Sequence, residues 1–382
     1  MNAFIKRLRP SGAAPRCVTL AAVLSLLLGA ASAMAAPVTV TNLITDDQSA
    51  NPAKLEDPSL KNAWGMSSSG GSPVWVSDNG TGVSTLYSID ATTNTPAKIG
   101  LTVTIPGDGS VTGQAFNTGA GAGAFNGNAF LFVSEDGTVS GWRGALGTTA
   151  EVLQTGSSSN SYKGSAVGAV NGNTYLYAAN FKTGAVDVLK GTAAAPDLTG
   201  NFADPNLPKG FAPFNIQNLG GKLYVTYAEQ DGGLDEVDGL GLGFVDVFDL
   251  SGNLLMRIGS GGTLNAPWGL AIAPSSFGEF AGDLLVGNFG DGRINIFDLA
   301  TMTFLQQLLG GDGNPVAIDG LWALAIGNGG AFGSTNKLYF TAGPDDESHG
   351  LFGVIEPVPE PATLLLLGTA LGAAGLQRRR RR

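Results

Sequence analysis

Hydrophobic residues in this chain gather in short runs, which are separated by turns rich in glycine, asparagine and aspartate. Residues 265–299 show the pattern once in full, with apolar or β-rich runs at 270–272, 283–286 and 293–297. Gly290-Asp291-Gly292 separates the last two runs and indicates a tight hairpin, because glycine takes the positive φ that such a turn requires. Before the C-terminal tail, no long stretch has the period of an amphipathic helix. The pattern therefore predicts short antiparallel strands.

The same order of runs and turns recurs at roughly 45 to 60 residues, a period in the range of propeller blades. Six copies can be recognised, at residues 63–90, 130–142, 162–189, 213–250, 265–299 and 319–355. One copy cannot bury both faces of its sheet unless neighbouring copies stack against it. The sequence therefore predicts an all-β fold, a six-bladed β-propeller over residues 37–356.

The segment 38–45 alternates β-branched residues and precedes the first copy. A ring of blades often closes by lending one terminal strand to the blade from the other end, which removes an exposed sheet edge. We expect this segment to have that role. A frayed N-terminus of the mature protein is the alternative.

The first 36 residues have the pattern of an export signal. A basic leader precedes an apolar run at 18–30, and Ala33-Met34-Ala35 provides small residues for cleavage. The run is short for a spanning helix, so we expect a cleaved signal peptide at 1–36 and not a permanent anchor. Cleavage also removes Cys17, the only cysteine, and leaves a mature protein without disulfides.

The last 26 residues, 357–382, differ abruptly in composition. A stiff proline-rich segment precedes a short apolar helix candidate at 363–376 and then an arginine cluster. The decisive residues are Pro359, Glu360, Pro361, Arg378, Arg379, Arg380, Arg381 and Arg382. This order resembles the PEP-CTERM sorting tail of Gram-negative bacteria. The apolar run spans a bilayer only marginally, while the arginines hold its end on the cytoplasmic side.

That resemblance implies recognition by an exosortase-type membrane enzyme after a transient stay in the inner membrane. Removal of the tail would then release the protein or attach it at the cell surface.

Charge narrows the choice of partner. The chain carries 21 Lys and Arg against 31 Asp and Glu. Without the leader and the arginine cluster, 12 basic residues remain against the same 31 acids, a net charge of −19. Such a surface repels nucleic acid and anionic lipid, and it suits divalent cations or neutral polymers such as an extracellular polysaccharide.

One candidate site comes from the ends of the second strands. Alignment of the copies on their apolar pairs places six residues in one column, namely Asp78, Glu135, Asn180, Tyr227, Asn288 and Ala342. Equivalent strand ends converge near one mouth of a propeller channel, so the carboxylates and amides could hold calcium or another ligand. The alternative is that Asp and Asn begin the turn after each strand and satisfy its backbone donors.

A second candidate metal site is the acidic insertion of the fourth copy, formed by Glu229, Asp231, Asp235, Glu236 and Asp238. Its spacing matches neither an EF-hand nor the nonapeptide calcium repeat. A solvated flexible loop is the simpler interpretation. A smaller cluster, with Asp345, Asp346, Glu347 and His349, occurs in the sixth copy.

Large aromatic residues recur at equivalent positions, at Trp64, Phe214, Trp268 and Trp322. Exposed, they could stack on sugars; buried, they would fill the space between blades. Their regular recurrence favours the core.

The repeats resemble NHL-type blades, most closely at 284–298. Residues 38–355 also resemble a family of uncharacterised exported bacterial proteins, through the phrases at 77–82, 135–138, 266–271 and 319–324. This resemblance implies architecture and export but brings no activity with it.

Common catalytic patterns are missing, since His349 is the only histidine and there is no Gly-x-Ser-x-Gly elbow or P-loop. We therefore expect an exported binding or structural module of the cell envelope or extracellular matrix. The alternative is a calcium-dependent hydrolase, by analogy with gluconolactonase-type propellers, which bind a metal at such a mouth.

Overall fold

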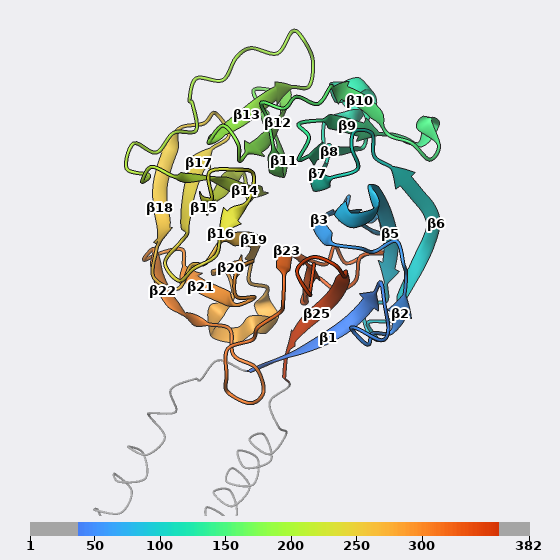
Figure 1. Cartoon of the computed structure of the whole chain (residues 1–382), viewed down its shortest axis with the longest axis vertical. Helices are drawn as coiled ribbons and strands as arrows, with labels where there is room; N and C mark the ends of the chain where they lie inside the picture. Colours follow the sequence, from blue (N-terminus) through green and yellow to red (C-terminus); the bar gives the residue numbers. More distant parts are fainter. Residues whose placement is uncertain (1–36, 359–382) are drawn as a thin grey trace, which may run out of the picture. The chain divides into compact units, whose positions relative to one another are not determined.

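The computed structural model describes residues 37–358, which form six sheets around a central axis, antiparallel except for one short parallel pairing in the last sheet (Figure 1). The first strands of the six sheets, β3, β7, β11, β14, β19 and β23, line this axis and contact one another around the ring. The all-β six-bladed propeller is thus confirmed.

Within each blade, the strands follow one another from the axis outward. Blade one contains β3 (Ala63–Ser67), β4 (Val74–Asp78), β5 (Val83–Ile89) and β6 (Pro96–Thr104). Blade two contains β7 (Val111–Phe116), β8 (Phe130–Ser134), β9 (Val139–Trp142) and β10 (Glu151–Gln154). Blade three contains β11 (Tyr162–Val170), β12 (Asn173–Asn180) and β13 (Ala185–Lys190).

Blade four contains β14 (Phe211–Leu219), β15 (Lys222–Gln230), β16 (Glu236–Val237), β17 (Phe244–Asp249) and β18 (Leu254–Ser260). Blade five contains β19 (Pro267–Ile272), β20 (Leu284–Asn288), β21 (Ile294–Asp298) and β22 (Thr303–Gln307). Blade six contains β23 (Leu321–Ile326), β24 (Leu338–Ala342), β25 (Leu351–Pro357), β1 (Val38–Thr45) and β2 (Leu55–Glu56). The short 3-10 helices are η1 (Asn79–Thr81), η2 (Ala120–Ala122), η3 (Ala124–Gly127), η4 (Gly144–Leu146) and η5 (Ser275–Phe280).

Burial decreases from the axis to the rim. Every residue of β20 is buried, whereas the outer strand β22 is largely exposed. Neighbouring blades cover both faces of an inner strand, which is why these strands appear in the sequence as apolar runs and not as alternating patterns. The hydrophobic core therefore lies between blades; for example, Val245 and Val247 of blade four pack with Leu270 and Val286 of blade five.

Blade two begins earlier than the repeat at 130–142 indicates. Its first strand, β7, has the sequence Val-Thr-Gly-Gln-Ala-Phe, in which threonine, glycine and glutamine interrupt the apolar run. The interruption hid this strand from the hydrophobic pattern. It also places Thr112 and Gln114 in the wall of the channel region.

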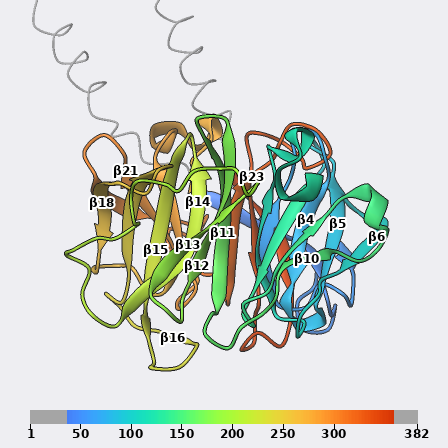
Figure 2. The ribbon, with the colours of Figure 1, turned by 90° about the horizontal axis from the view of Figure 1, so that it is seen from above.

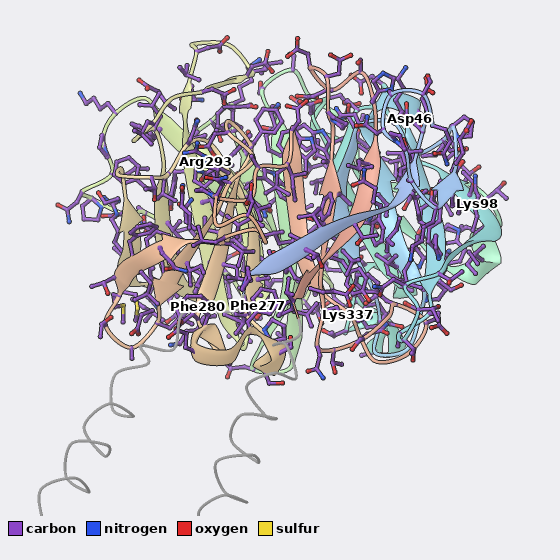
Figure 3. The ribbon with its side chains drawn as sticks, turned by 90° about the horizontal axis from the view of Figure 1, so that it is seen from below. Asp46, Lys98, Phe277, Phe280, Arg293 and Lys337 are labelled. Carbon is purple, nitrogen blue, oxygen red and sulfur yellow. The ribbon has the colours of Figure 1, made fainter. Side chains whose placement is uncertain are left out.

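The two ends of the propeller meet in blade six. β1 pairs antiparallel with β25, with Val38 opposite Pro357 and Thr45 opposite Leu351. Figure 3 shows β1 beside the strands of the C-terminal part. The expectation that 38–45 closes the ring is confirmed, because the first strand of the described residues joins the sheet of the last blade.

Within residues 37–358, no helix is long and apolar enough to cross a membrane. The expected signal peptide and the apolar helix of the tail fall outside the described residues.

We predict that ring closure depends on the buried side of β1. Ile44 is fully buried, so Ile44→Ala should lower the free energy of unfolding by about 2–5 kcal/mol, measured by urea denaturation of the full chain. Val40 lies on the same strand but is 40% exposed, so Val40→Ala should change it by about 0.5 kcal/mol or less. Equal, small effects of both variants would mean that the strand frays.

Candidate functional site

The pairing of first and second strands shows which residues are equivalent between blades. Residues at the end of the second strand pair with the start of the first in all six blades, and the pairs are Ala63 with Asp78, Val111 with Ser134, Tyr162 with Asn180, Pro213 with Tyr227, Pro267 with Asn288 and Leu321 with Ala342. Ser134, and not Glu135, thus occupies the expected column. Glu135 is the first turn residue after β8 and does not belong to this column.

The true column members form contacts inside their own blades. The Thr85 hydroxyl donates to Asp78 Oδ2 at 2.7 Å, and Asn180 Nδ2 donates to Asp187 Oδ2 at 2.8 Å. In the same way, Asn295 Nδ2 donates to Asn288 Oδ1 at 3.1 Å. In each of these three blades the partner stands seven residues later, on the third strand.

This column therefore joins the second strand to the third and does not assemble a ring of oxygen donors with Glu135. Asn180 also accepts backbone hydrogen bonds from Ser161 and Thr183, as the turn-forming alternative expects. Burial raises the pKa of Asp78 well above its ordinary value. The buried Tyr227 hydroxyl has no hydrogen-bond partner among the described residues.

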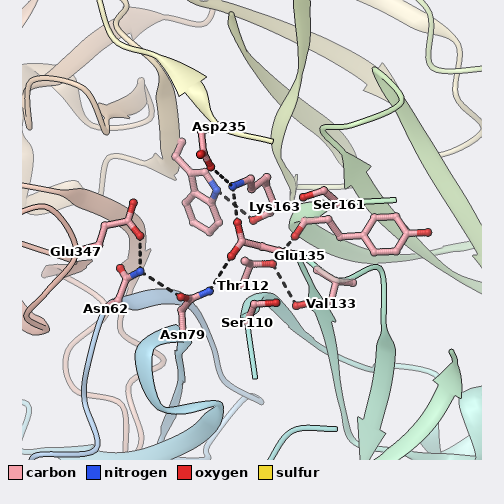
Figure 4. Close-up of polar contacts among 12 residues, drawn as sticks. Asn62, Asn79, Ser110, Thr112, Val133, Glu135, Ser161, Lys163, Asp235 and Glu347 are labelled. Carbon is pink, nitrogen blue, oxygen red and sulfur yellow. Dashed lines mark hydrogen bonds and ion pairs between the residues drawn. The ribbon is translucent and has the colours of Figure 1, made fainter. Parts of the chain in front are cut away.

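Glu135 instead faces Lys163 at one mouth of the channel (Figure 4). Lys163 Nζ lies 2.5 Å from Glu135 Oε1 and 3.7 Å from Asp235 Oδ1. The ammonium also lies 5.2 Å from the centre of the Trp64 ring. Lys163 is only 2% exposed, so this charge is held almost entirely by protein groups.

Lys163 stands where four of the other five blades carry an aromatic residue, and blade two has Thr112 there. The pairs given above define an equivalent position in each blade, one residue after the paired residue of the first strand. This position is occupied by Trp64, Phe214, Trp268 and Trp322. In blade three the same position is Lys163. No catalytic or metal-binding motif includes Lys163, although its departure from the aromatic pattern is a signal visible in the sequence.

Asparagines extend the contacts across the mouth. Asn79 Nδ2 donates to Glu135 Oε2 at 3.2 Å, and Asn62 Nδ2 donates to Asn79 Oδ1 at 3.3 Å. Asn62 Nδ2 also donates to Glu347 Oε2 at 2.5 Å. The network thus joins the ends of blades one, two, three and six.

The acidic insertion of blade four folds over this network. β16 pairs with the end of β15, with Glu229 opposite Val237 and Gln230 opposite Glu236, and this pairing brings Asp235 to Lys163. Figure 2 shows β16 at one end of the propeller. Three acidic segments that are separate in the sequence therefore meet here.

The other insertion residues have different surroundings. The backbone N–H of Gly233 donates to Asp231 Oδ1 at 2.5 Å, which shapes the loop tip. Burial and the neighbouring Asp291 raise the pKa of Asp238. Among residues 37–358, no group of three or more His, Asp or Glu side chains has the arrangement of a metal site.

Charge at the mouth is unbalanced. Burial opposes the charge of Lys163, but Glu135 and Glu236 raise its pKa above the ordinary lysine value. Burial raises the pKa of Glu236 to about 7, against the influence of Lys163. Burial also raises the pKa of Glu347, and the charge of Glu135 adds to this effect. One ammonium therefore faces an excess of carboxyl groups.

The aromatic residues close the channel beneath this network. Trp64 stacks on Trp322 with ring centres 3.7 Å apart, and Phe289 stacks on Trp322 at 4.0 Å. Trp64, Trp268, Trp322 and Phe214 are all at least 96% buried. The interpretation of these aromatics as core residues is confirmed.

A polar groove of about 820 Å³ opens beside Lys163, between blades two and three. Its walls carry carboxylate, hydroxyl, amide and ammonium groups, including those of Asp108, Glu135, Asp136, Thr155, Ser158, Asn160, Lys182 and Asp235. We call it the mouth groove. Its lining can donate and accept many hydrogen bonds at once.

We predict that Glu236 makes stability depend on pH near neutrality. Its pKa of about 7 in the folded state exceeds the ordinary glutamate value, so its contribution is complete at acidic pH and is lost as the pH rises through 7. From pH 5.5 to 8.5 the free energy of unfolding of the wild type should fall by roughly 1–3 kcal/mol more than that of Glu236→Gln, measured by urea denaturation. Glu279→Gln, at an exposed carboxylate, should behave like the wild type. Parallel pH profiles of Glu236→Gln and wild type would contradict the prediction.

Comparison with known proteins gives three kinds of similarity. Residues 357–382 match the PEP-CTERM protein-sorting motif. A structure of a glucose dehydrogenase is similar over 84% of this chain and all of that chain, with 12% identity and a TM-score of 0.48. The periplasmic gluconolactonase of Pseudomonas aeruginosa is similar over 75% of this chain and 82% of that chain, with 16% identity and a TM-score of 0.44. These two likenesses concern the fold alone.

Two relatives come from Acanthamoeba polyphaga mimivirus. Uncharacterized protein R648 is 32% identical over 80% of this chain and 77% of its own length. Uncharacterized protein L690 is 31% identical over 78% of this chain and 80% of its own length. The similarity extends over most of both partners in each comparison. This chain therefore belongs to the same protein family as these two uncharacterised viral proteins.

Proposed function

We propose that this protein is an exported binding module that holds a hydroxyl-rich extracellular polymer, such as a polysaccharide, in the mouth groove. Export and surface sorting are what a PEP-CTERM motif implies, and an exosortase-type enzyme is its partner. The observation that carries the proposal is the groove of about 820 Å³ lined by hydroxyl, amide and carboxylate groups beside Lys163.

The groove suits a polymer better than a compact apolar ligand. Thr155, Ser158 and Lys182 are exposed along it, so a chain of sugars can exchange water for their hydroxyl and ammonium groups. Polar recognition of this kind is commonly completed by bridging waters. No aromatic side chain lines the groove within the described residues, so hydrogen bonds would provide its selectivity.

Charge determines which polymers are accepted. Four carboxylates, those of Asp108, Glu135, Asp136 and Asp235, line the groove together with Lys182. Like charges across an interface reject a partner. The groove should therefore favour neutral or amino-bearing polysaccharides and exclude acidic ones.

We predict that the full chain co-sediments or binds in affinity electrophoresis with dextran or chitosan but not with alginate. Ser158→Trp fills the groove from an exposed position and should weaken binding at least tenfold without changing thermal stability. Thr303→Trp, on the exposed outer strand of blade five, is the matched control and should bind like the wild type. Equal binding by both variants would mean that the polymer does not bind in the mouth groove.

A calcium-dependent hydrolase is the second candidate, favoured by the carboxylates of Glu135, Asp235, Glu236 and Glu347 that gather around one ammonium. Carboxylate oxygens are the ligands that calcium prefers. A group such as Glu236, with a pKa of about 7, also titrates where a general base works best.

We predict that calcium separates the two candidates. If the mouth binds calcium, the Tm of the full chain should rise at constant ionic strength, by the equivalent of about 2.7 kcal/mol at a hundredfold excess over Kd. The double change of Glu135 and Glu347 to glutamine should abolish the shift. Asp78→Asn, inside blade one, should leave it unchanged. A Tm that is constant across millimolar calcium, with no turnover of lactones or esters, would exclude the hydrolase.

A further inference from the structure

We propose that the channel contains a second binding site, at the end opposite Lys163, for a small uncharged polyhydroxyl molecule of about the size of a monosaccharide. The site is a cavity of about 430 Å³, lined by the later residues of all six inner strands, including Gly65, Gln114, Ser165, Ile216, Ile272 and Leu324. We call it the channel cavity. It shares no lining residue with the mouth groove, so it stands independently of the function proposed above.

The aromatic cluster separates the two sites. Trp268 lines the channel cavity, while its indole N–H donates to the carbonyl of Lys163 at 3.2 Å, on the side of the mouth. Trp64 and Trp322 stack beside it. A ligand in the cavity would therefore rest against an aromatic and apolar floor and have no contact with the ion pair.

Glycines allow the inner strands to approach one another closely, and they place no side chain in the space that the strands surround. A Cβ on Gly65 would lie 2.7 Å from the carbonyl oxygen of Thr112, and one on Gly113 would lie 2.6 Å from the backbone nitrogen of Ser165. Larger residues cannot occupy these positions without moving backbone. Figure 2 shows the inner strands β11, β14 and β23 running along the axis.

Three buried polar atoms at the cavity lack a hydrogen-bond partner among the described residues. Gln114 is only 5% exposed; its Nε2 donates to Gly65 O at 2.9 Å, but its Oε1 has no donor. The hydroxyls of Ser67 and Ser165 are likewise buried and unpartnered. These three residues belong to blades two, one and three and line the same cavity.

An unsatisfied buried acceptor costs about 1–3 kcal/mol, so a molecule that donates to these atoms would bind favourably. Hydroxyl groups can donate and accept, which fits one carbonyl oxygen and two hydroxyls. Ile216, Ile272 and Phe332 give the cavity apolar walls. Such walls suit the C–H groups on one face of a sugar ring better than they suit water.

The channel cavity should exclude charged ligands. None of the lining residues is Asp, Glu, Lys, Arg or His. Burial of an ion without a partner is costly, so acidic or amino-bearing analogues should be rejected. The volume lies within the range of about 300–1,000 Å³ that is usual for small-molecule sites.

The test is a titration of the full chain by calorimetry and ligand-observed NMR. The neutral probes are glucose, galactose, N-acetylglucosamine and myo-inositol, and the charged analogues are glucuronate and galacturonate. We expect saturable binding of at least one neutral probe and at least tenfold weaker binding of both charged analogues.

Gln114→Leu keeps the size of the side chain but removes the acceptor, and Ser67→Leu narrows the cavity from another blade. Each should weaken binding about fivefold or more, and two variants guard against misfolding of either one. Thr303→Trp, on the exposed outer strand of blade five, is the matched control and should retain wild-type affinity. The proposal is overturned if no neutral probe binds, which would leave water as the partner of these atoms. It is also overturned if charged analogues bind equally, or if Gln114→Leu and Ser67→Leu weaken binding no more than Thr303→Trp does.

Discussion

Each sheet of this protein depends on burial against its neighbours on both sides. An inner strand such as β20 is apolar on both faces, and it is stable only because the blades before and after it remove those faces from water. A row of such sheets has two unprotected ends. The pairing of β1 with β25 joins them, so the stability of every blade depends on one pairing between residues more than three hundred positions apart in the chain.

Closure of the ring also creates the channel and its two unlike ends. Six inner strands converge on one axis, and the close approach at glycines such as Gly65 and Gly113 leaves little room for side chains. The tryptophans that fill the axis divide it into separate compartments. One compartment opens beside a charged network, and the other is lined entirely by uncharged groups.

The charged end depends on one of the two departures from the aromatic pattern, the lysine of blade three. Lys163 replaces an aromatic residue, and a buried ammonium must be matched by carboxylates because desolvation would otherwise be too costly. Glu135 and Asp235 supply that match from two other blades. A buried ion pair is a weak source of stability compared with apolar packing. The main consequence of the network is therefore the set of charged groups at the mouth, and its contribution to folding stability is small.

The sequence alone determined the features that depend on local or periodic patterns. The spacing of apolar runs predicted six blades, the alternation at 38–45 predicted the closing strand, and the recurrence of Trp64, Trp268 and Trp322 predicted core packing. The residues at 357–382 were sufficient for the sorting motif, because such a signal is read as a linear segment. Each of these features needs only a short stretch, or its repetition, to be visible.

Only the tertiary structure decided the composition of the site. Glu135 was aligned with the last residues of the second strands, but it is the turn residue that follows β8, and this shift of one residue separates a blade-internal contact from the channel mouth. Asn62 and Glu347 meet across 285 positions, and Lys163 meets Asp235 only because β16 pairs with β15. Contacts of this kind depend on ring closure and on how strands bend at the axis. Hydrophobic periodicity reports which residues are buried, but it does not contain the relative positions of side chains on different blades.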